Sequence, residues 1–248
     1  MSFDSYYWHE WDIPDPRLAE LRRKLASGEG GVDTFSELLR SDSVVAVGVA
    51  LDHYRYEESL TRFGQGNPFE ELEPIILEVA RTTLATPPHG MSYASALRVL
   101  GDLGDSDDSR TIASILRTSA SQEVVSAALW AAGAALSYTE EEDEELVRAI
   151  SEVIFDESRR MQDRVDAVLA FSQVENETVG IILARSARVP HEEIQVEALA
   201  LLIDYYMDSQ LETVEDVVNS WSQDVGPVKE QIVRSFNVAK AAREKKLS

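Results

Sequence analysis

A short pattern of small and apolar residues recurs between residues 50 and 236, at intervals typical of helix-turn-helix repeats. Each copy has a small or apolar residue, an apolar residue directly after it, and another three positions later. These spacings place the side chains on one face of an α-helix. The first, or anchor, positions are Ala50, Ala96, Ala128, Ala167, Ala198 and Ile232, which lie 46, 32, 39, 31 and 34 residues apart. We therefore expect one helical unit to repeat with loops of different length.

The alanine at most anchors has a physical reason. Two helices approach closely only where a side chain is short, and the apolar residues beside it form a buried stripe. A pair of such helices leaves an apolar face that only the next pair can cover, so the units stack.

Breaks between helices are predicted where Gly, Pro and capping residues cluster, and strand patterns are scarce. The breaks fall at residues 27–31, 64–68, 86–90, 101–108, 138–140, 189–190 and 226–227. The predicted fold is all-α, a right-handed α-solenoid of about six helical hairpins at residues 31–248. An N-terminal aromatic segment and capping helix are expected at residues 1–30, because end repeats must hide their open apolar face.

The clearest copy of the pattern is ALRVLGDLGD at residues 96–105. It resembles the second helix and exit loop of a HEAT repeat, and the resemblance extends over about residues 33–243. Arg164 before Ala167, and Val228 and Lys229 before Ile232, are similar to further positions of that repeat. An armadillo-like stack would leave a similar pattern.

The end of this copy predicts a helix boundary. Gly101 or Gly104 is expected to make the left-handed turn that ends the helix. Asp105, Ser106 or Asp107 is expected to cap the next one. The alternative is a calcium loop, but the alternating acids, central glycine and terminal glutamate of that motif are missing.

The resemblance implies that second helices line a concave face and that their variable positions contact a protein partner. In the register of this chain, those positions are Asp52, Arg98, Trp130, Asp166, Glu197, Asp204 and Arg234. The face is expected to be predominantly acidic. Trp130 is a candidate hot spot, since tryptophan is enriched at such anchors; the alternative is that it fills space left by the alanines around it.

The charge of the chain is strongly negative, with 45 acidic and 23 basic residues and a formal net charge of -22. Such a field repels nucleic acids and anionic membranes and favours basic partners. The alternative is an acidity that serves solubility or tolerance of high salt, which the count of only five lysines favours.

No linear motif for catalysis was found. The chain has no cysteine, which excludes disulfides and thiolate chemistry. The four histidines show no metal-ligand spacing, and His53 is expected at a solvated or edge position. Neither a nucleophile elbow nor a phosphate-binding loop is present. We expect no catalytic residue, no cofactor and no metal site.

Two further segments have alternative interpretations. The acidic run at residues 140–145 follows Thr139, a plausible helix cap, and the helix dipole favours anions there; it could instead dock a basic partner. The aromatic residues 3–11 are expected to fold back as a cap, and the alternative is a free arm that seeks a partner.

These observations favour a non-catalytic scaffold, adaptor or inhibitor of a bacterial type that binds a basic protein. One form is an immunity protein that neutralises a toxin such as a nuclease, whose positive groove an acidic surface could occlude. The alternatives are a HEAT-like glycosylase or lyase, and a halophile-adapted scaffold. Without a signal peptide or an apolar run of membrane-spanning length, a cytoplasmic location is expected.

Overall fold

The computed structural model describes residues 13–61, 64, 66–86, 90–138, 143–221 and 226–247. Within these ranges all regular structure is helical, which confirms the all-α prediction. The α-helices are α1 (Pro16–Ala26), α2 (Val32–Leu39), α3 (Val44–Thr61), α4 (Glu73–Leu84), α5 (Gly90–Leu103), α6 (Ser106–Thr118), α7 (Gln122–Tyr138), α8 (Glu144–Phe155), α9 (Met161–Leu169), α10 (Glu177–Ser186), α11 (Glu192–Tyr205), α12 (Met207–Ser220) and α13 (Pro227–Leu247). A short 3-10 helix, η3 (Glu70–Leu72), precedes α4. The aromatic residues 3–11 lie outside the described ranges. None of the described helices combines the length and apolarity needed to cross a bilayer.

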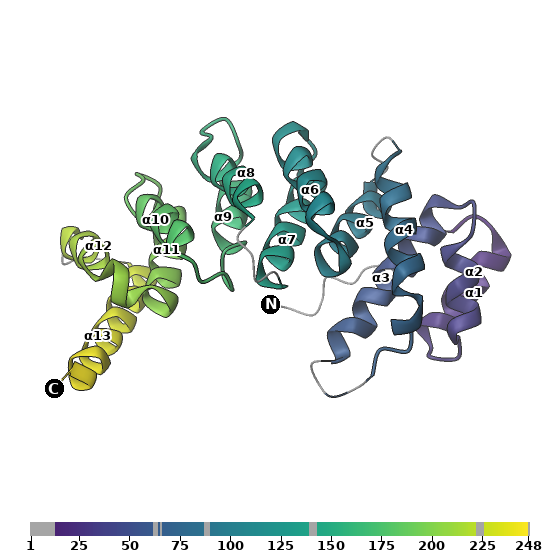
Figure 1. The fold of residues 1–248 in the computed structure, drawn as a ribbon, viewed down its shortest axis with the longest axis horizontal. Coiled ribbons are helices and arrows are strands. Elements are labelled where there is room, and N and C mark those ends of the chain that lie inside the picture. Colours follow the sequence, from purple (N-terminus) through teal and green to yellow (C-terminus); the bar gives the residue numbers. More distant parts are fainter. Residues whose placement is uncertain are drawn as a thin grey trace. The chain divides into compact units, whose positions relative to one another are not determined.

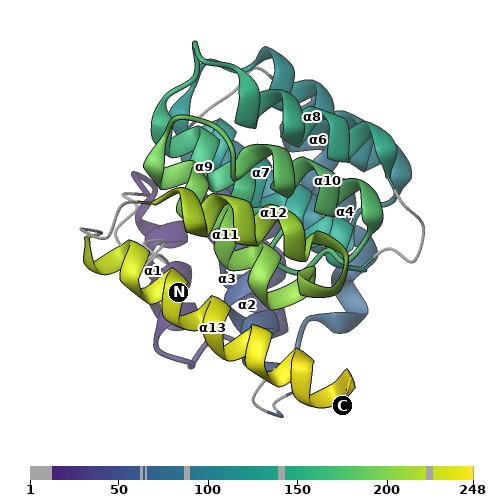
Figure 2. The same cartoon turned by 90° about the vertical axis from the view of Figure 1, so that its left-hand side faces the viewer.

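The chain divides into two compact units, with the boundary inside α6 and α7. Unit 1 comprises Met1–Ile112 and Ser119–Ala131, and unit 2 comprises Ala113–Thr118 and Ala132–Ser248. In unit 1, α3 packs against α2 and α5, and α4 packs against α5 (Figure 1). In unit 2, α11 packs against α9, α10 and α13 (Figure 2).

From α3 to α13, every second helix of the chain contains one anchor position. The five alanine anchors are fully buried and Ile232 is nearly so. This confirms the buried stripe predicted from the spacing. The helices that carry the anchors, α3, α5, α7, α9, α11 and α13, are called the second helices below.

Gly101 and Gly104 have a different role from the predicted one. Among the described residues only Gly28 and Gly64 have positive φ, so the prediction of a left-handed turn at residue 101 or 104 is wrong. Gly101 lies inside α5, where an added Cβ would come within 2.5 Å of the Cα of Ala131 in α7. The glycine is needed because two helix backbones approach closely, not because of its φ.

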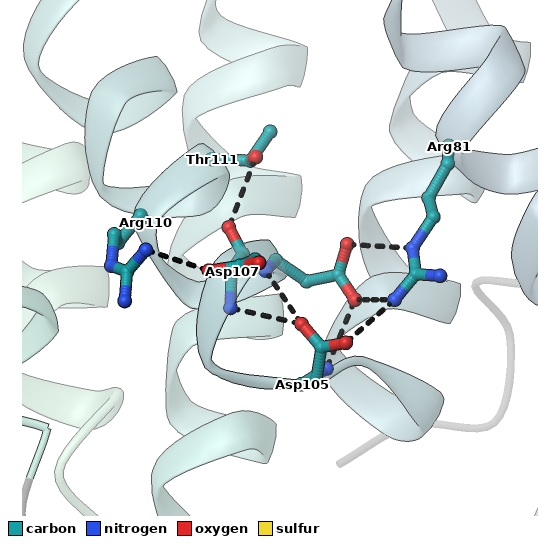
Figure 3. A network of polar contacts seen from close by, with 6 residues as sticks. Arg81, Asp105, Asp107, Arg110 and Thr111 are labelled. Atoms are coloured by element: carbon teal, nitrogen blue, oxygen red, sulfur yellow. Dashed lines mark hydrogen bonds and ion pairs between the residues drawn. The ribbon is translucent and has the colours of Figure 1, made fainter.

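The aspartates after α5 mark the boundary between two helices, and Asp105 caps the second of them, as predicted. The Oδ1 atom of Asp105 accepts hydrogen bonds from the backbone N–H of Asp107 at 2.9 Å and of Asp108 at 3.2 Å, which caps α6. Arg81 of α4 donates two hydrogen bonds to the Asp108 carboxylate, at 3.1 and 2.8 Å, and one to Asp105 at 2.9 Å (Figure 3). The bonds from the backbone N–H groups of Asp108 and Asp107, with the nearby arginine, hold the pKa of Asp105 below its usual value.

The start of α8 differs from the predicted one. The helix begins at Glu144 and its cap is Asp143, whose side chain accepts from the backbone N–H of Leu146 at 3.0 Å. Thr139, the predicted cap, and residues 140–142 lie outside the described ranges. Within the described part, Glu144 and Glu145 occupy the first turn, where the helix dipole favours negative charge.

We predict that Asp105→Ala lowers the free energy of unfolding by about 1 kcal/mol, because it removes the cap of α6 together with an exposed hydrogen bond from Arg81. Asp107→Ala is the matched control, since among the described residues its exposed side chain bonds Arg110 alone, in the same helix, and its effect should stay within about 0.5 kcal/mol. Urea unfolding measures both. Equal effects of the two substitutions would contradict the capping role of Asp105.

We also predict that Gly101→Ala destabilises the protein by about 1–3 kcal/mol, because the new methyl group must push α5 away from Ala131. An alanine normally stabilises a helix interior by about 1 kcal/mol relative to glycine, so the expected sign is reversed. Gly66→Ala is the control, because a Cβ there meets no atom within 4 Å. Thermal unfolding of both variants tests the claim, and a stabilised Gly101→Ala variant would refute it.

Candidate functional site

Three of the predicted contact residues, Asp52, Arg98 and Trp130, meet in unit 1. They come from three successive second helices, α3, α5 and α7. Further polar side chains from α3 and α5 join them. The whole set, called the polar cluster, consists of Asp52, Arg55, Ser95, Arg98, Asp102 and Trp130.

Arg55 links the three helices of the polar cluster. Its Nε atom donates a hydrogen bond to Oδ2 of Asp102 on α5 at 3.0 Å. Its guanidinium carbon lies 4.0 Å from the centre of the Trp130 ring on α7. A guanidinium at this distance from an aromatic face makes a favourable cation–π contact. Arg55 therefore holds the Trp130 ring from one side and is itself held by Asp102.

Asp52 is buried inside unit 1 in the free protein, which corrects the prediction that it lies on an exposed face. The residue is only 3% exposed. Burial raises the pKa of its carboxyl group, while a hydrogen bond with Ser95 and the charges of Arg98 and Arg55 act in the opposite direction. The physical reason for the difference is that Asp52 is used inside unit 1, where it joins α3 to α5.

Arg98 and Trp130 are both half-buried, so part of each side chain remains at the surface of unit 1. The residues on either side of Trp130 in α7, Leu129 and Ala131, are buried. Trp130 therefore lies off the buried stripe, as its register predicts. Whether it contacts a partner stays a prediction.

The polar cluster is balanced in formal charge, because it contains two acidic residues, Asp52 and Asp102, and two basic residues, Arg55 and Arg98. The prediction of a predominantly acidic face does not hold here. A balanced cluster attracts neither acids nor bases from a distance, so its contribution to binding has to come from contact geometry.

The other four predicted contact residues lie in unit 2. Asp166 on α9 is half-buried and accepts a hydrogen bond from Gln162 at 2.8 Å. Glu197 is half-buried and Asp204 is exposed, both on α11. Arg234 on α13 is exposed and lies 3.4 Å from Glu230, one turn earlier in the same helix.

Acidic side chains form a line along α11. Glu193, Glu197 and Asp204 follow one another at spacings of four and seven residues, which places them on one face of the helix. We call them the acidic stripe. Neighbouring Glu192 pairs with Lys229 at 3.0 Å, whereas no carboxylate of the stripe forms an ion pair with another residue of the described ranges. The acidic stripe therefore contains predicted contact residues whose negative charge is not neutralised by an ion pair within the described ranges.

A cavity of about 250 Å³ lies in unit 2 between the end of α6 and α8. Its arginines are already engaged: Arg117 bonds Glu145 at 3.1 Å and Glu152 at 2.8 Å, and Arg159 donates to the backbone oxygen of Leu116 at 2.6 Å. These contacts tie α6 to α8. The cavity is a packing feature with no evident chemistry.

His53 differs from its prediction. The sequence predicts a solvated or edge position, but the residue is only 5% exposed, because its ring packs edge-on against Phe69 with 5.6 Å between the ring centres. Burial lowers its pKa to about 4. The Glu57 carboxylate, 3.7 Å away, would favour the charged imidazole, but the loss of hydration dominates.

Sequence reasoning missed Arg55, Asp102 and Glu193. Each lies one helical turn from a predicted contact residue: Arg55 follows Asp52 by three positions, and Asp102 follows Arg98 by four. Polar residues at these spacings share a helix face. A search for polar neighbours one turn away would have found all three.

Comparison with protein-family models and with curated proteins found no match to this chain. The described residues contain no group of three or more His, Asp or Glu side chains placed to hold a metal ion. The function is therefore inferred from the polar cluster and the acidic stripe themselves.

We predict a loss of stability at acid pH that depends on His53. The unfolded chain takes up the imidazole proton near pH 6.5 and the folded chain only near pH 4, so stability falls as the pH decreases through this window. Between pH 7.5 and 4.5 the loss attributable to His53 is about 2–3 kcal/mol.

Urea unfolding of the wild type and of His53→Gln at both pH values measures this loss. The variant lacks the titrating group, so its stability should fall by less between the two pH values. The comparison also removes the opposing contribution of Asp52, which both proteins share. Parallel pH profiles would show that His53 does not titrate as its burial implies.

Proposed function

We propose that the chain is a non-catalytic protein-binding scaffold or inhibitor, an α-solenoid of the HEAT-like kind, which binds a basic protein through acidic side chains on its second helices. In this proposal the second helices line a concave binding face. The inhibitory form of the function would occlude the positive groove of a partner such as a nuclease.

The acidic stripe is the observation that carries this proposal. Glu197 and Asp204 stand at positions that the HEAT-like register assigns to partner contact, and Glu193 extends the same line by one turn. Their spacing spreads the charges over about 16 Å of helix. A line of carboxylates with no ion pair to another described residue suits a row of lysines or arginines on a partner.

The net charge of -22 supports the same partner class. It attracts a basic protein over about one Debye length, roughly 8–10 Å at moderate salt. Attraction of this kind raises the association rate and weakens as salt is added. It also opposes binding to nucleic acid.

The buried anchors support the repeated architecture. They recur in every second helix, and α5 and α7 approach so closely at Gly101 that only a glycine fits there. Such contact between successive second helices is what stacking of hairpins requires.

We predict that the chain, used as bait in a native lysate, retains a basic protein at low salt and loses it at high salt. Replacing the acidic stripe with Glu193→Gln, Glu197→Gln and Asp204→Asn should weaken the dissociation constant of that purified partner by about tenfold, since each exposed charge pair contributes about 0.5 kcal/mol. Calorimetry or surface plasmon resonance measures the change.

The control is a second triple variant, Glu78→Gln, Glu157→Gln and Glu212→Gln. It changes the net charge by the same amount as the stripe variant, but at exposed residues outside the second helices. It should retain most of the affinity. Equal weakening by both triple variants would mean that only net charge matters and that the stripe is not the site. An affinity that does not change with salt concentration would refute an acidic binding surface altogether.

A further inference from the structure

We propose that Trp130, Asp102 and Asp52 form a binding site for an arginine side chain, which Arg55 fills in the free protein and which an arginine of the basic partner enters on binding. This inference rests on the proposed function and names the partner side chain that it recognises. It concerns unit 1 alone.

The occupied state is visible in the structure. The Arg55 guanidinium has an aromatic plane at 4.0 Å, from Trp130, and a carboxylate oxygen at 3.0 Å, from Asp102. Arginine recognition commonly combines these two elements: a flat π-face for the planar cation and a carboxylate for its N–H groups. The two groups come from different helices and are positioned by the fold around a guanidinium.

Asp52 provides a hydrogen-bond acceptor, its Oδ1 atom, that Arg55 does not use. Its Oδ1 atom is buried and accepts no hydrogen bond from another described residue, although Arg55 is close enough to affect the pKa of the carboxyl group. A buried carboxylate oxygen without a donor is unfavourable, because it has lost its hydration without replacement. A guanidinium has five N–H donors in a fixed fork, so a second orientation or a second arginine can satisfy this oxygen.

Trp130 is half-buried and Arg55 is only 7% exposed, so an external arginine reaches the ring when the Arg55 side chain moves outward. When an external arginine enters and Arg55 leaves, one guanidinium loses water and another regains it, so the net change in free energy is small. Arg55 has the advantage of being attached to the same chain, which acts as a high effective concentration. A partner must therefore add contacts outside this site.

Geometry also predicts selectivity for arginine over lysine. A lysine ammonium is a compact, strongly hydrated charge that cannot lie flat on the indole ring and bond Asp102 with an in-plane N–H. The site should therefore discriminate between two side chains of equal charge.

The test removes the internal occupant. Arg55→Ala should bind N-acetyl-arginine amide in a saturable way and about tenfold or more tightly than the wild type, where Arg55 competes. N-acetyl-lysine amide is the charge-matched control and should bind neither protein measurably. Isothermal calorimetry at constant ionic strength measures binding, and the thermal midpoint of Arg55→Ala should rise with N-acetyl-arginine amide.

The double variant Arg55→Ala/Trp130→Ala lacks the aromatic plane and should lose this binding. If Arg55→Ala does not fold, Arg55→Gln keeps a polar chain in its place and is tested in the same way. Equal binding of the arginine and lysine amides, or no gain over the wild type, would overturn the arginine site. Either result would leave the acidic stripe, and with it the proposed function, to be judged by the triple variants.

Discussion

The close approach of successive second helices is the constraint on which the rest of the structure depends. In unit 1 the backbones of α5 and α7 meet at Gly101 and Ala131. In unit 2 the same contact recurs at Gly133, where an added Cβ would lie 2.8 Å from the carbonyl oxygen of Ala170. Both glycines follow their alanine anchor by five residues. Helices this close allow Arg55 of α3 to reach Trp130 of α7, so the polar cluster is a consequence of the packing.

The two units use their second helices in different ways. In unit 1 the charges compensate one another, and what they stabilise is the position of Trp130 over Arg55. In unit 2 the acidic stripe on α11 has no ion pair with another residue of the described ranges. Compensated clusters favour specificity of contact, whereas uncompensated charge favours attraction and rapid encounter.

The helical fold could be predicted from the sequence because its signals are local. An alanine followed by apolar residues at helical spacing is buried wherever the helix packs, and Asp105 caps α6 through atoms only two and three residues away. The burial of His53 could not be predicted, because Phe69, from a different element, covers it. The same holds for Asp52, whose position is decided by Ser95 and Arg98 on α5. Helical register assigns a residue to a face, but tertiary partners decide whether that face is open.

The boundary between the two units runs through helices rather than loops. Both α6 and α7 begin in unit 1 and continue into unit 2. Breaking a helix in its middle removes backbone hydrogen bonds on both sides of the break, so neither unit can be detached without damage to both. Cooperative folding units usually coincide with whole supersecondary motifs. Local opening in one unit is therefore expected to fray the shared helices of the other, and the chain is expected to unfold as a coupled whole instead of as two independent domains.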